Sequence, residues 1–515
     1  MNDEQQQFGD WNPIEFEEHG IKLLGNIRNH FTNIRDIPVS SRVSTEELLS
    51  IFDQALPEEP QSFETIMDET WKKVIPHLTH WNHPSFHGYF SNSASFPGIL
   101  ADLLISSLNV NTMVWQASPS ASIIDGIVLK WMAEMVDYDS SADGVLVNGA
   151  SLASFYALVA ARDQCTDVDI RTEGLINTSV PTMRIYTSSQ SHSSIDKAAI
   201  ALGIGTDNVI HIATNHKYQM QSEQLEKAIQ EDLKQGYCPI AVVATVGTTS
   251  TGAVDPIMEI SQICKKYNIW LHIDAAYGGF WNLVPDVRRH SESLQVADSL
   301  VVNPHKCLYT PLEVSALFCK RKKALVNSFC LVPEYLQTIK SEGAIDFMDY
   351  SLQLGRNFRA LKLWWIIRSF GKQGLSERLK KSLQLKAWLE SKINEHPEFS
   401  CVATSPFALL CIRYIPKEVQ QTLNKATQAE KQDLQKYIDY LNALLLMRVN
   451  QSQKTFLSHA VILDGYVIRI SIGNIHTTEG DIYMLWDLLK SSATEINSLH
   501  PFSTYSTTIS SSKNI

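Results

Sequence analysis

Between about residues 83 and 380, short apolar runs alternate with stretches of helical periodicity. The runs are nearly continuous in apolar residues, as strands buried on both faces require. They are Gly144–Val147, Met183–Thr187, Val209–Ile212, Ala241–Val246, Ile269–Ile273, Ser299–Val302 and Ala316–Cys319. Because helical patterns separate them, the sequence predicts βαβ units and a mainly parallel sheet with helices on both sides. The expected fold class is therefore α/β.

The two ends of the chain show other patterns. From Pro13 to about His80 the sequence is mostly helical, and Ser44-Thr45-Glu46-Glu47 opens one helix with capping residues. After about residue 380, long helical patterns flank the apolar runs Phe407–Tyr414 and Tyr466–Ile472, which indicates a small α+β domain. The expected divisions are an N-terminal helical segment (1–82), a large α/β domain (83–380), a small domain (381–498) and a tail (499–515). Residues 1–12 and the Ser/Thr-rich tail are expected to be disordered.

Composition narrows the class of protein. The 515 residues carry a formal net charge of −11, which disfavours nucleic acid and anionic membranes as partners. We find no apolar stretch of membrane-spanning length, and the acidic, polar first residues do not resemble a signal peptide. The eight cysteines lie far apart and form no CxxC pair, which is typical of reduced thiols in a cytoplasmic protein.

Three residues that are candidates for catalysis follow predicted strands. Asp274 ends Ile-Trp-Leu-His-Ile-Asp, Lys306 follows Ser299–Val302, and His192 follows Met183–Thr187. In an open α/β sheet, ligands bind beyond the carboxyl ends of the strands. A buried carboxylate needs a cation, and a lysine beside it is a candidate Schiff-base nucleophile. Together they suit pyridoxal phosphate, which needs a lysine for its aldehyde and a carboxylate for its pyridine nitrogen.

A phosphate needs N–H and hydroxyl groups around it. Asn148-Gly149-Ala150-Ser151 follows one strand and opens a predicted helix, which is a natural anion site. Gly247-Thr248-Thr249 ends another strand, and its hydroxyl groups could reach the cofactor.

Each of these residues also has a simpler explanation. A lysine after a strand is usually solvated, Asp274 could cap a turn, and a Gly-Ala-Ser start is usually only a helix cap. His80, His83 and His87 allow a metal interpretation, but Pro84 interrupts them and no nearby acid or cysteine completes a ligand set. We therefore expect no metal site, and the residues alone leave the cofactor open.

At these positions the sequence resembles the group II pyridoxal-phosphate-dependent decarboxylases, and most closely the aromatic-L-amino-acid decarboxylases. The resemblance extends from about Trp81 to the last predicted strand. It rests on the motifs HPSFHGYF, WQASPSASIID, NGASLASFYALVAAR, SQSHSSIDKA, ATVGTTSTGAVDP, WLHIDAAYGG, NPHK and LGRNFRALKLWW.

This resemblance implies a fold and a set of roles. The fold is the fold type I, aspartate-aminotransferase-like architecture, assembled as a homodimer with shared active sites. By analogy Lys306 bonds to the cofactor's aldehyde, Asp274 pairs with the pyridine nitrogen and His192 stacks on the ring. The other implied cofactor contacts are Ala150, Ser151, Thr249, Ala276, Asn303 and His305.

The resemblance also implies a mobile loop over roughly Cys330–Asp349. Its tyrosine, matched here by Tyr335, reaches the neighbouring subunit's site in the family and protonates the substrate carbon after carbon dioxide leaves. Relatives with phenylalanine at this position are aldehyde synthases. We therefore expect Tyr335 to be catalytic.

The chain departs from the aromatic decarboxylases at three places. It has Cys307 where a tryptophan is usual, Ser91-Asn92 where Pro-Thr is usual, and Met113 at an aromatic pocket position. The expected substrate-binding residues are Trp81, Tyr89, Phe90, Asn92, Met113 and Gly355. An aromatic wall favours an aromatic side chain. In plant relatives, a glycine matching Gly355 accompanies indolic substrates, so tryptophan is the first candidate, ahead of phenylalanine, tyrosine or DOPA.

Two other functions remain as alternatives. One is decarboxylation of an acidic amino acid such as glutamate, aspartate or cysteine sulfinate, which would need a cationic pocket residue. No Arg or Lys occurs in residues 81–92 or 111–118. The other is a pyridoxal-phosphate-binding protein without catalysis, which the presence of Lys306, His192 and Tyr335 disfavours.

Overall fold

The computed structural model describes residues 10–176, 179–291, 293–331, 344–463 and 465–502. At its centre lies a seven-stranded sheet in the order β1-β7-β6-β5-β4-β2-β3. Only β7 runs antiparallel, against β1 and β6, so the sheet is mainly parallel as expected. Each apolar run expected in this region is one of its strands: β1 (Asp143–Val147), β2 (Met183–Ser188), β3 (Val209–Ile212), β4 (Cys238–Thr245), β5 (Trp270–Asp274), β6 (Ser299–Val302) and β7 (Ser315–Cys319).

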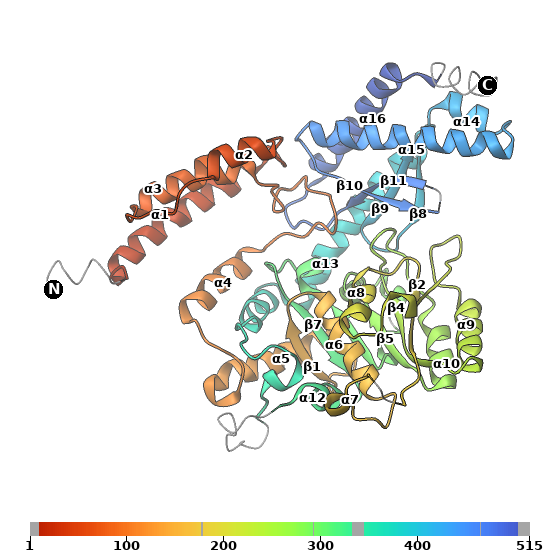
Figure 1. The fold of residues 1–515 in the computed structure, drawn as a ribbon. Coiled ribbons are helices and arrows are strands. Elements are labelled where there is room, and N and C mark those ends of the chain that lie inside the picture. Colours follow the sequence, from red (N-terminus) through yellow and green to blue (C-terminus); the bar gives the residue numbers. More distant parts are fainter. Residues whose placement is uncertain (1–9, 177–178, 292, 332–343, 464, 503–515) are drawn as a thin grey trace.

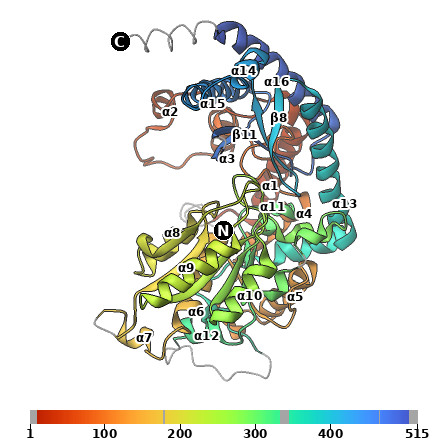
Figure 2. The same cartoon turned by 90° about the vertical axis from the view of Figure 1, so that its right-hand side faces the viewer.

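Helices cover both faces of this sheet. Figure 2 shows α6 and α8 on one side of the strands and α5 and α10 on the other. Every residue of β5 is buried, which explains why its sequence is apolar up to Asp274 except at His272. The helices of this region are α4 (Phe96–Leu108), α5 (Pro119–Met135), α6 (Ala150–Asp163), α7 (Ile170–Glu173), α8 (Ser194–Ala201), α9 (Ser222–Lys234), α10 (Ile257–Tyr267), α11 (Pro304–Cys307) and α12 (Ala324–Phe329).

A second sheet forms the C-terminal part of the molecule. Its four antiparallel strands follow the order β10-β11-β9-β8. The two expected apolar runs contain β9 and β11, whereas β8 and β10 were not expected. The strands are β8 (Phe399–Thr404), β9 (Leu409–Tyr414), β10 (Ser458–Ile462) and β11 (Gly465–Ser471), and the helices are α14 (Lys417–Leu423), α15 (Gln428–Gln451) and α16 (Glu479–Leu499).

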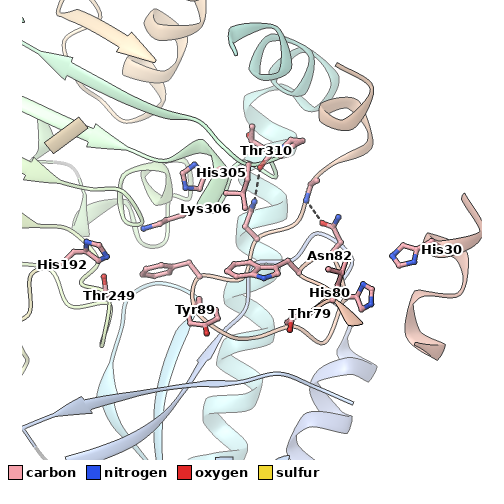
Figure 3. Close-up of a pocket in the computed structure, with 17 residues that line it drawn as sticks. His30, Thr79, His80, Asn82, Tyr89, His192, Thr249, His305, Lys306 and Thr310 are labelled. Atoms are coloured by element: carbon pink, nitrogen blue, oxygen red, sulfur yellow. Dashed lines mark hydrogen bonds between the residues drawn. The ribbon is translucent and has the colours of Figure 1, made fainter. Parts of the chain in front are cut away.

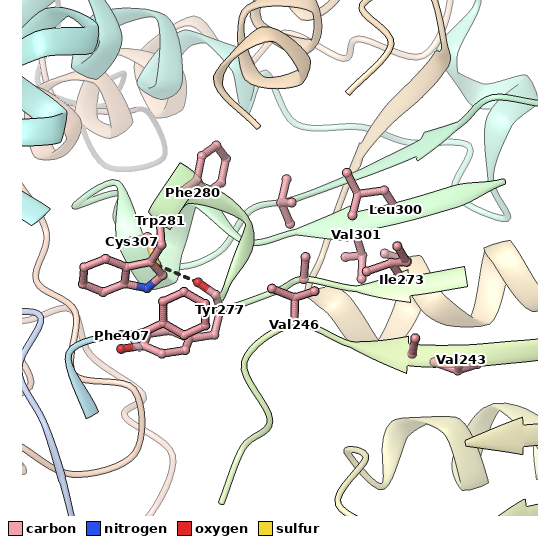
Figure 4. Packing of buried hydrophobic residues seen from close by; sticks show 14 of the residues in the cluster. Val243, Val246, Ile273, Tyr277, Phe280, Trp281, Leu300, Val301, Cys307 and Phe407 are labelled. Atoms are coloured by element: carbon pink, nitrogen blue, oxygen red, sulfur yellow. Dashed lines mark hydrogen bonds between the residues drawn. The ribbon is translucent and has the colours of Figure 1, made fainter. Parts of the chain in front are cut away.

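One long helix, α13 (Ala360–Glu395), runs from the large domain into the small one (Figure 1). It is interrupted at Gly371, whose φ of 64° and ψ of 167° are not helical. Phe407 of the small domain packs against Tyr277 and Trp281 of the large domain, with ring centroids 5.7 Å away in both cases (Figure 4). These aromatic contacts hold the two sheets against each other.

Residues 83–95 also join the two sheets. His87 donates its backbone N–H to Phe456, and Ser471 of β11 donates its N–H to His87. A Cβ on Gly473 would lie 2.0 Å from the carbonyl oxygen of Ser91, so this close approach requires glycine. The segment that carries the predicted aromatic wall is thus fixed to the small sheet.

The N-terminal helices α1 (Pro13–Thr32), α2 (Thr45–Phe52) and α3 (Phe63–Glu69) stand away from both sheets (Figure 1). Ser44 and Glu47 form the expected capping box at α2. Asn12 caps α1 together with Glu15, so residues 10–12 have a defined place, whereas residues 1–9 and 503–515 of the expected disordered ends lie outside the described residues. No helix within the described ranges is long and apolar enough to cross a membrane.

Candidate active site

The carboxyl ends of neighbouring parallel strands bring the predicted residues together. Asp274 is the last residue of β5, and Lys306 lies in α11 directly after β6. These two strands pair, with Asp274 opposite Val301. Thr249 follows β4 and His192 follows β2, at the same edge of the sheet. Parallel strands therefore explain why residues far apart in the chain share one site.

A cavity of about 620 Å³ opens at this edge. Figure 3 shows Lys306 reaching toward the end of the cavity that holds His192 and Thr249, with His30 at the far end. The predicted residues that line it are Trp81, Tyr89, Phe90, Asn92, His192, Thr249, His305 and Lys306. Further lining residues, which the sequence did not indicate, include His30, His80, Asn82 and Thr310.

The charge state of Lys306 depends on its surroundings. Burial lowers the pKa of the Lys306 amine, the Asp274 carboxylate acts to raise it, and the Arg469 guanidinium lowers it further. The net shift is downward, so the neutral, nucleophilic amine is more populated than for an exposed lysine. The ammonium form lies over the ring of Phe90, with Nζ 4.5 Å from the ring centroid.

The two predicted histidines of the site, His192 and His305, favour the neutral imidazole. Burial lowers the pKa of His192, and it lowers the pKa of His305 to about 4. His192 Nδ1 accepts a hydrogen bond from the N–H of Ser194 at 3.1 Å, which places its proton on Nε2. His305 Nδ1 lies 2.6 Å from the carbonyl oxygen of Val314 and 3.2 Å from the backbone nitrogen of the same residue. The flat, neutral ring of His192 can therefore stack on a planar ligand.

Asp274 is 8% exposed, and its neighbours hold it in place. Its Oδ1 accepts the N–H of Ala276 at 3.0 Å, so this residue caps the turn that follows β5. The N–H of Asn303 in turn donates to the carbonyl oxygen of Ala276 at 3.2 Å, which links the ends of β5 and β6. The other carboxylate oxygen remains for a cationic ligand group.

The expected phosphate site has the form of an anion cradle. Gly149 has a φ of 86°, which favours glycine, and no heavy atom lies within 4 Å of the position where its Cβ would be. Ala150 and the exposed Ser151 begin α6, a helix of 14 residues. The buried oxygens Asn148 Oδ1 and Asn303 Oδ1 have no hydrogen-bond partner within the described residues. Open space and helix N–H groups fit the phosphate of pyridoxal phosphate, whereas the two amide oxygens are acceptors and need donor groups.

Two predicted substrate residues do not reach this cavity within one chain. Met113 accepts the N–H of Met348 at 3.1 Å through its carbonyl oxygen, and Gly355 lies beside Asn111. Asn111 Nδ2 is 3.4 Å from the sulfur of Met113, so both residues belong to one separate surface region. Tyr335 lies outside the described residues. Cys307 is buried in the core, where its thiol donates to the carbonyl oxygen of Tyr277 at 3.2 Å (Figure 4).

The structure adds one residue that the sequence reasoning missed. Arg469, on β11, lies with its Cζ 4.5 Å from the ring centroid of Phe90. No local motif marks it, but an arginine within the apolar run Tyr466–Ile472 was a usable signal, because a charge in a buried strand needs a partner. Within the described ranges, no group of three or more His, Cys, Asp or Glu side chains is placed to hold a metal ion.

Comparisons with known proteins agree with this geometry. A family model described as the pyridoxal-dependent decarboxylase conserved domain matches residues 45–415. The chain is 32% identical to tyrosine decarboxylase 4 of Petroselinum crispum, over 93% of this chain and 94% of that protein. It is 32% identical to tryptophan decarboxylase 2 of Oryza sativa subsp. japonica, over 94% and 95%. It is 31% identical to phenylacetaldehyde synthase of Rosa hybrid cultivar, over 95% and 96%.

Comparison with solved structures supports the same family. The structure of Oryza sativa TDC with PLP and tryptamine superposes with a TM-score of 0.88 at 29% identity, covering 95% of this chain and 100% of that one. Catharanthus roseus tryptophan decarboxylase in complex with L-tryptophan gives a TM-score of 0.85 at 27% identity, with the same coverage. The similarity in fold thus extends over nearly the whole chain.

Proposed function

The chain belongs to the pyridoxal-dependent decarboxylase family, and on this premise we propose that it decarboxylates an aromatic L-amino acid, with tryptophan as the first candidate. The products are the arylalkylamine and carbon dioxide. The observation that carries this proposal is the aromatic wall beside Lys306. The rings of Trp81 and Tyr89 stack with centroids 5.5 Å apart and an interplanar angle of 7°, and Phe90 lies next to the lysine. Such a wall suits a flat aromatic side chain.

The proposed roles follow from the positions of the side chains. Pyridoxal phosphate, when bound, supplies an electron sink for the pair left on the substrate's α-carbon. Lys306 would hold the cofactor covalently through its amine, and Asp274 would keep a proton on the pyridine nitrogen. His192 would stack on the ring, and the first turn of α6 with Ser151 would bind the phosphate.

The fate of the substrate carbon depends on a proton donor. We assign this role to Tyr335, whose phenol can protonate the carbon and so yield the amine. A relative named phenylacetaldehyde synthase shows that aldehyde formation is the competing outcome to be tested. Because Tyr335 is a tyrosine, amine is the expected product.

The functional unit in this proposal is a homodimer. The 20-residue helix α1 buries none of its side chains, and Ile14, Phe16 and Ile21 each expose more than half of their surface. A second copy of the chain would cover this apolar face. We further propose that the surface region of Met113 and Gly355 completes the partner's cavity in this dimer. Cross-linking and light scattering of the purified protein test this assembly.

A second candidate function has one observation in its favour. Arg469 brings a cation to the wall of the site, although residues 81–92 and 111–118 contain none, so decarboxylation of an acidic amino acid stays an alternative. Carbon dioxide release should be assayed with tryptophan, phenylalanine, tyrosine, DOPA, glutamate, aspartate and cysteine sulfinate. Turnover of the aromatic amino acids with tryptophan fastest would support the proposal, and a preference for the acidic ones would reject it.

A further inference from the structure

Two cysteines of the large domain bring their thiols into contact on the side of the sheet away from the candidate active site. Cys165 follows α6, whose last residue is Asp163, and Cys238 is the first residue of β4. Their side chains are hydrogen-bonded to each other, and both residues are half-buried. The candidate site residues lie at the other ends of the same elements, with Ser151 in the first turn of α6 and Thr249 after β4. The thiols therefore form a pair that the proposed decarboxylation does not use.

The contact makes Cys238 the more acidic of the two thiols. The hydrogen bond from Cys165 lowers the pKa of Cys238 to about 7, although burial opposes this shift. The same bond raises the pKa of Cys165, and burial, the charge of Cys238 and the carboxylate of Asp163 add to the effect. The single thiol proton of Cys165 can also be donated to the carbonyl oxygen of Arg162 at 3.0 Å. When Cys238 is ionised, that proton stabilises its thiolate, so Cys238 carries the negative charge near neutral pH.

Five other cysteines of the chain differ from this pair. Burial raises the pKa of each of them to about 12: Cys264, Cys307, Cys319, Cys401 and Cys411. Because the thiolate is the nucleophile, these five thiols should react slowly near neutral pH. Cys401 is half-buried, as Cys238 is, so it is a matched reference for the reactivity of Cys238.

We propose that Cys165 and Cys238 form a redox-sensitive pair, which a small-molecule disulfide such as oxidised glutathione converts into an intramolecular disulfide. The Cys238 thiolate attacks one sulfur of glutathione disulfide, whose S–S bond breaks, and one glutathione leaves as a thiolate. Cys165 then gives its proton to a glutathione thiolate and attacks the sulfur of Cys238, which releases the second glutathione. Two protein thiols are thus oxidised, and one glutathione disulfide is reduced to two thiols. The contact between the two side chains places the second nucleophile beside the first.

The new bond would join two elements that carry parts of the candidate site. The loop between Cys165 and Cys238 contains α8, α9 and His192, the proposed ring-stacking residue. A disulfide that closes a long loop restricts the unfolded chain. The bond would therefore fix the segment that carries His192 between α6 and β4. The inference does not depend on the proposed activity, and its tests do not require turnover.

Thiol mapping of the holoenzyme tests the proposal. Reduced protein, freed from the reductant, is treated with oxidised glutathione at neutral pH. The remaining thiols are then blocked, and the peptides are mapped by mass spectrometry without reduction. We expect a linked peptide pair that joins Cys165 to Cys238 and that disappears after treatment with dithiothreitol. The proposal would be overturned if both thiols stayed free, if glutathione remained on Cys238, or if Cys238 were linked to another cysteine.

Variants and a competing label separate the roles of the two thiols. In Cys165→Ala, Cys238 loses the hydrogen bond that lowers its pKa, so the reaction should be slower and should stop with glutathione on Cys238. Cys401→Ala should form the disulfide as the wild type does. In the wild type, limiting iodoacetamide at neutral pH should alkylate Cys238 at least about tenfold faster than Cys401. Equal rates would contradict Cys238 as the attacking thiol, and this measurement together with the wild-type peptide map decides if Cys165→Ala does not fold.

Discussion

Lys306 and Arg469 come from different sheets and lie over the same aromatic ring. Lys306 follows β6 of the seven-stranded sheet and Arg469 belongs to β11 of the four-stranded sheet, yet each places its charged group 4.5 Å from the centroid of Phe90. Two cations this close repel each other, and the Arg469 guanidinium lowers the pKa of the Lys306 amine. The relationship joins the reactive amine to a residue more than 160 positions later in the chain.

This repulsion predicts a shift in the titration of Lys306. Burial lowers the pKa of its amine first, and Arg469 adds to that effect. Arg469→Met removes the positive neighbour, so the pKa of Lys306 should rise toward its usual value. The pH profile for labelling of Lys306 by an amine reagent in cofactor-free protein should then move to higher pH. An unmoved profile would mean that the two charges do not interact, and Arg413→Lys, which changes a buried arginine on the neighbouring strand β9, serves as the control.

The covalent attachment of the cofactor should identify Lys306. Purified protein should absorb in the visible range, and borohydride reduction should fix pyridoxal phosphate to the peptide that contains Lys306. Lys306→Ala should abolish both the label and turnover. Lys362 is another buried lysine, held by Asp102, and recovery of the label there would reject the assignment.

Asp274 should matter for rate more than for folding. Asp274→Asn removes the negative charge that keeps the pyridine nitrogen protonated, so we expect a loss of about 3 kcal/mol of transition-state stabilisation, roughly a hundredfold in rate. Asp255 is a matched control, because this buried carboxylate only accepts the backbone N–H groups of Met220 and Thr245. Asp255→Asn should lower stability without changing the cofactor spectrum. Near-normal turnover in Asp274→Asn would contradict its role.

Complementation tests whether Tyr335 acts across a dimer interface. Lys306→Ala and Tyr335→Phe chains should each form little amine alone. In a mixed dimer one site receives both an intact Lys306 and an intact Tyr335, so part of the amine formation should return. Verified heterodimers without recovered activity would place Tyr335 in its own subunit's site.

Product analysis tests Tyr335 as the proton donor. The wild type should make mainly the arylalkylamine, whereas Tyr335→Phe should shift the product toward the aldehyde with oxygen uptake and hydrogen peroxide release. Mass spectrometry with an oxygen electrode measures both. Undiminished amine formation by the Phe variant would exclude this role for Tyr335.

Acid should destabilise the fold through buried neutral histidines. Burial lowers the pKa of His87 from 6.5 to about 4, so the unfolded chain takes up a proton that the folded chain refuses. The stability this histidine contributes is present above its unfolded pKa and is lost as pH falls toward the folded value, by about 2 kcal/mol between about pH 7 and about pH 5. His87→Gln should flatten that dependence in urea unfolding. If the free energy of unfolding of the variant changed with pH as steeply as that of the wild type, His87 would have to be protonated in the folded protein.

Local pattern was sufficient for the large sheet and most of its site. Runs such as Ile269–Ile273 are nearly all apolar because both faces of each strand are covered, and this burial is visible in the sequence. Because parallel strands place their carboxyl ends at the same edge of the sheet, Asp274, Lys306 and Thr249 are expected to lie near one another. The strands β8 and β10 escaped prediction. The residues of β10 alternate between half-buried and exposed before Ile462, and this weakens the apolar signal of an edge strand.

Contacts between distant parts of the chain required the tertiary structure. The sequence did not place Arg469 beside Phe90, because that contact depends on how residues 83–95 pack against β11, almost 380 positions away. From the sequence, Met113 and Gly355 were expected to line the cavity, whereas within one chain they lie in a separate surface region. A strand's apolar pattern reports only whether its own faces are buried. The packing of the two domains decides which side chains of the two sheets meet. Here Phe407 packs against Tyr277 and Trp281, and the local periodicity of the sequence does not predict this contact.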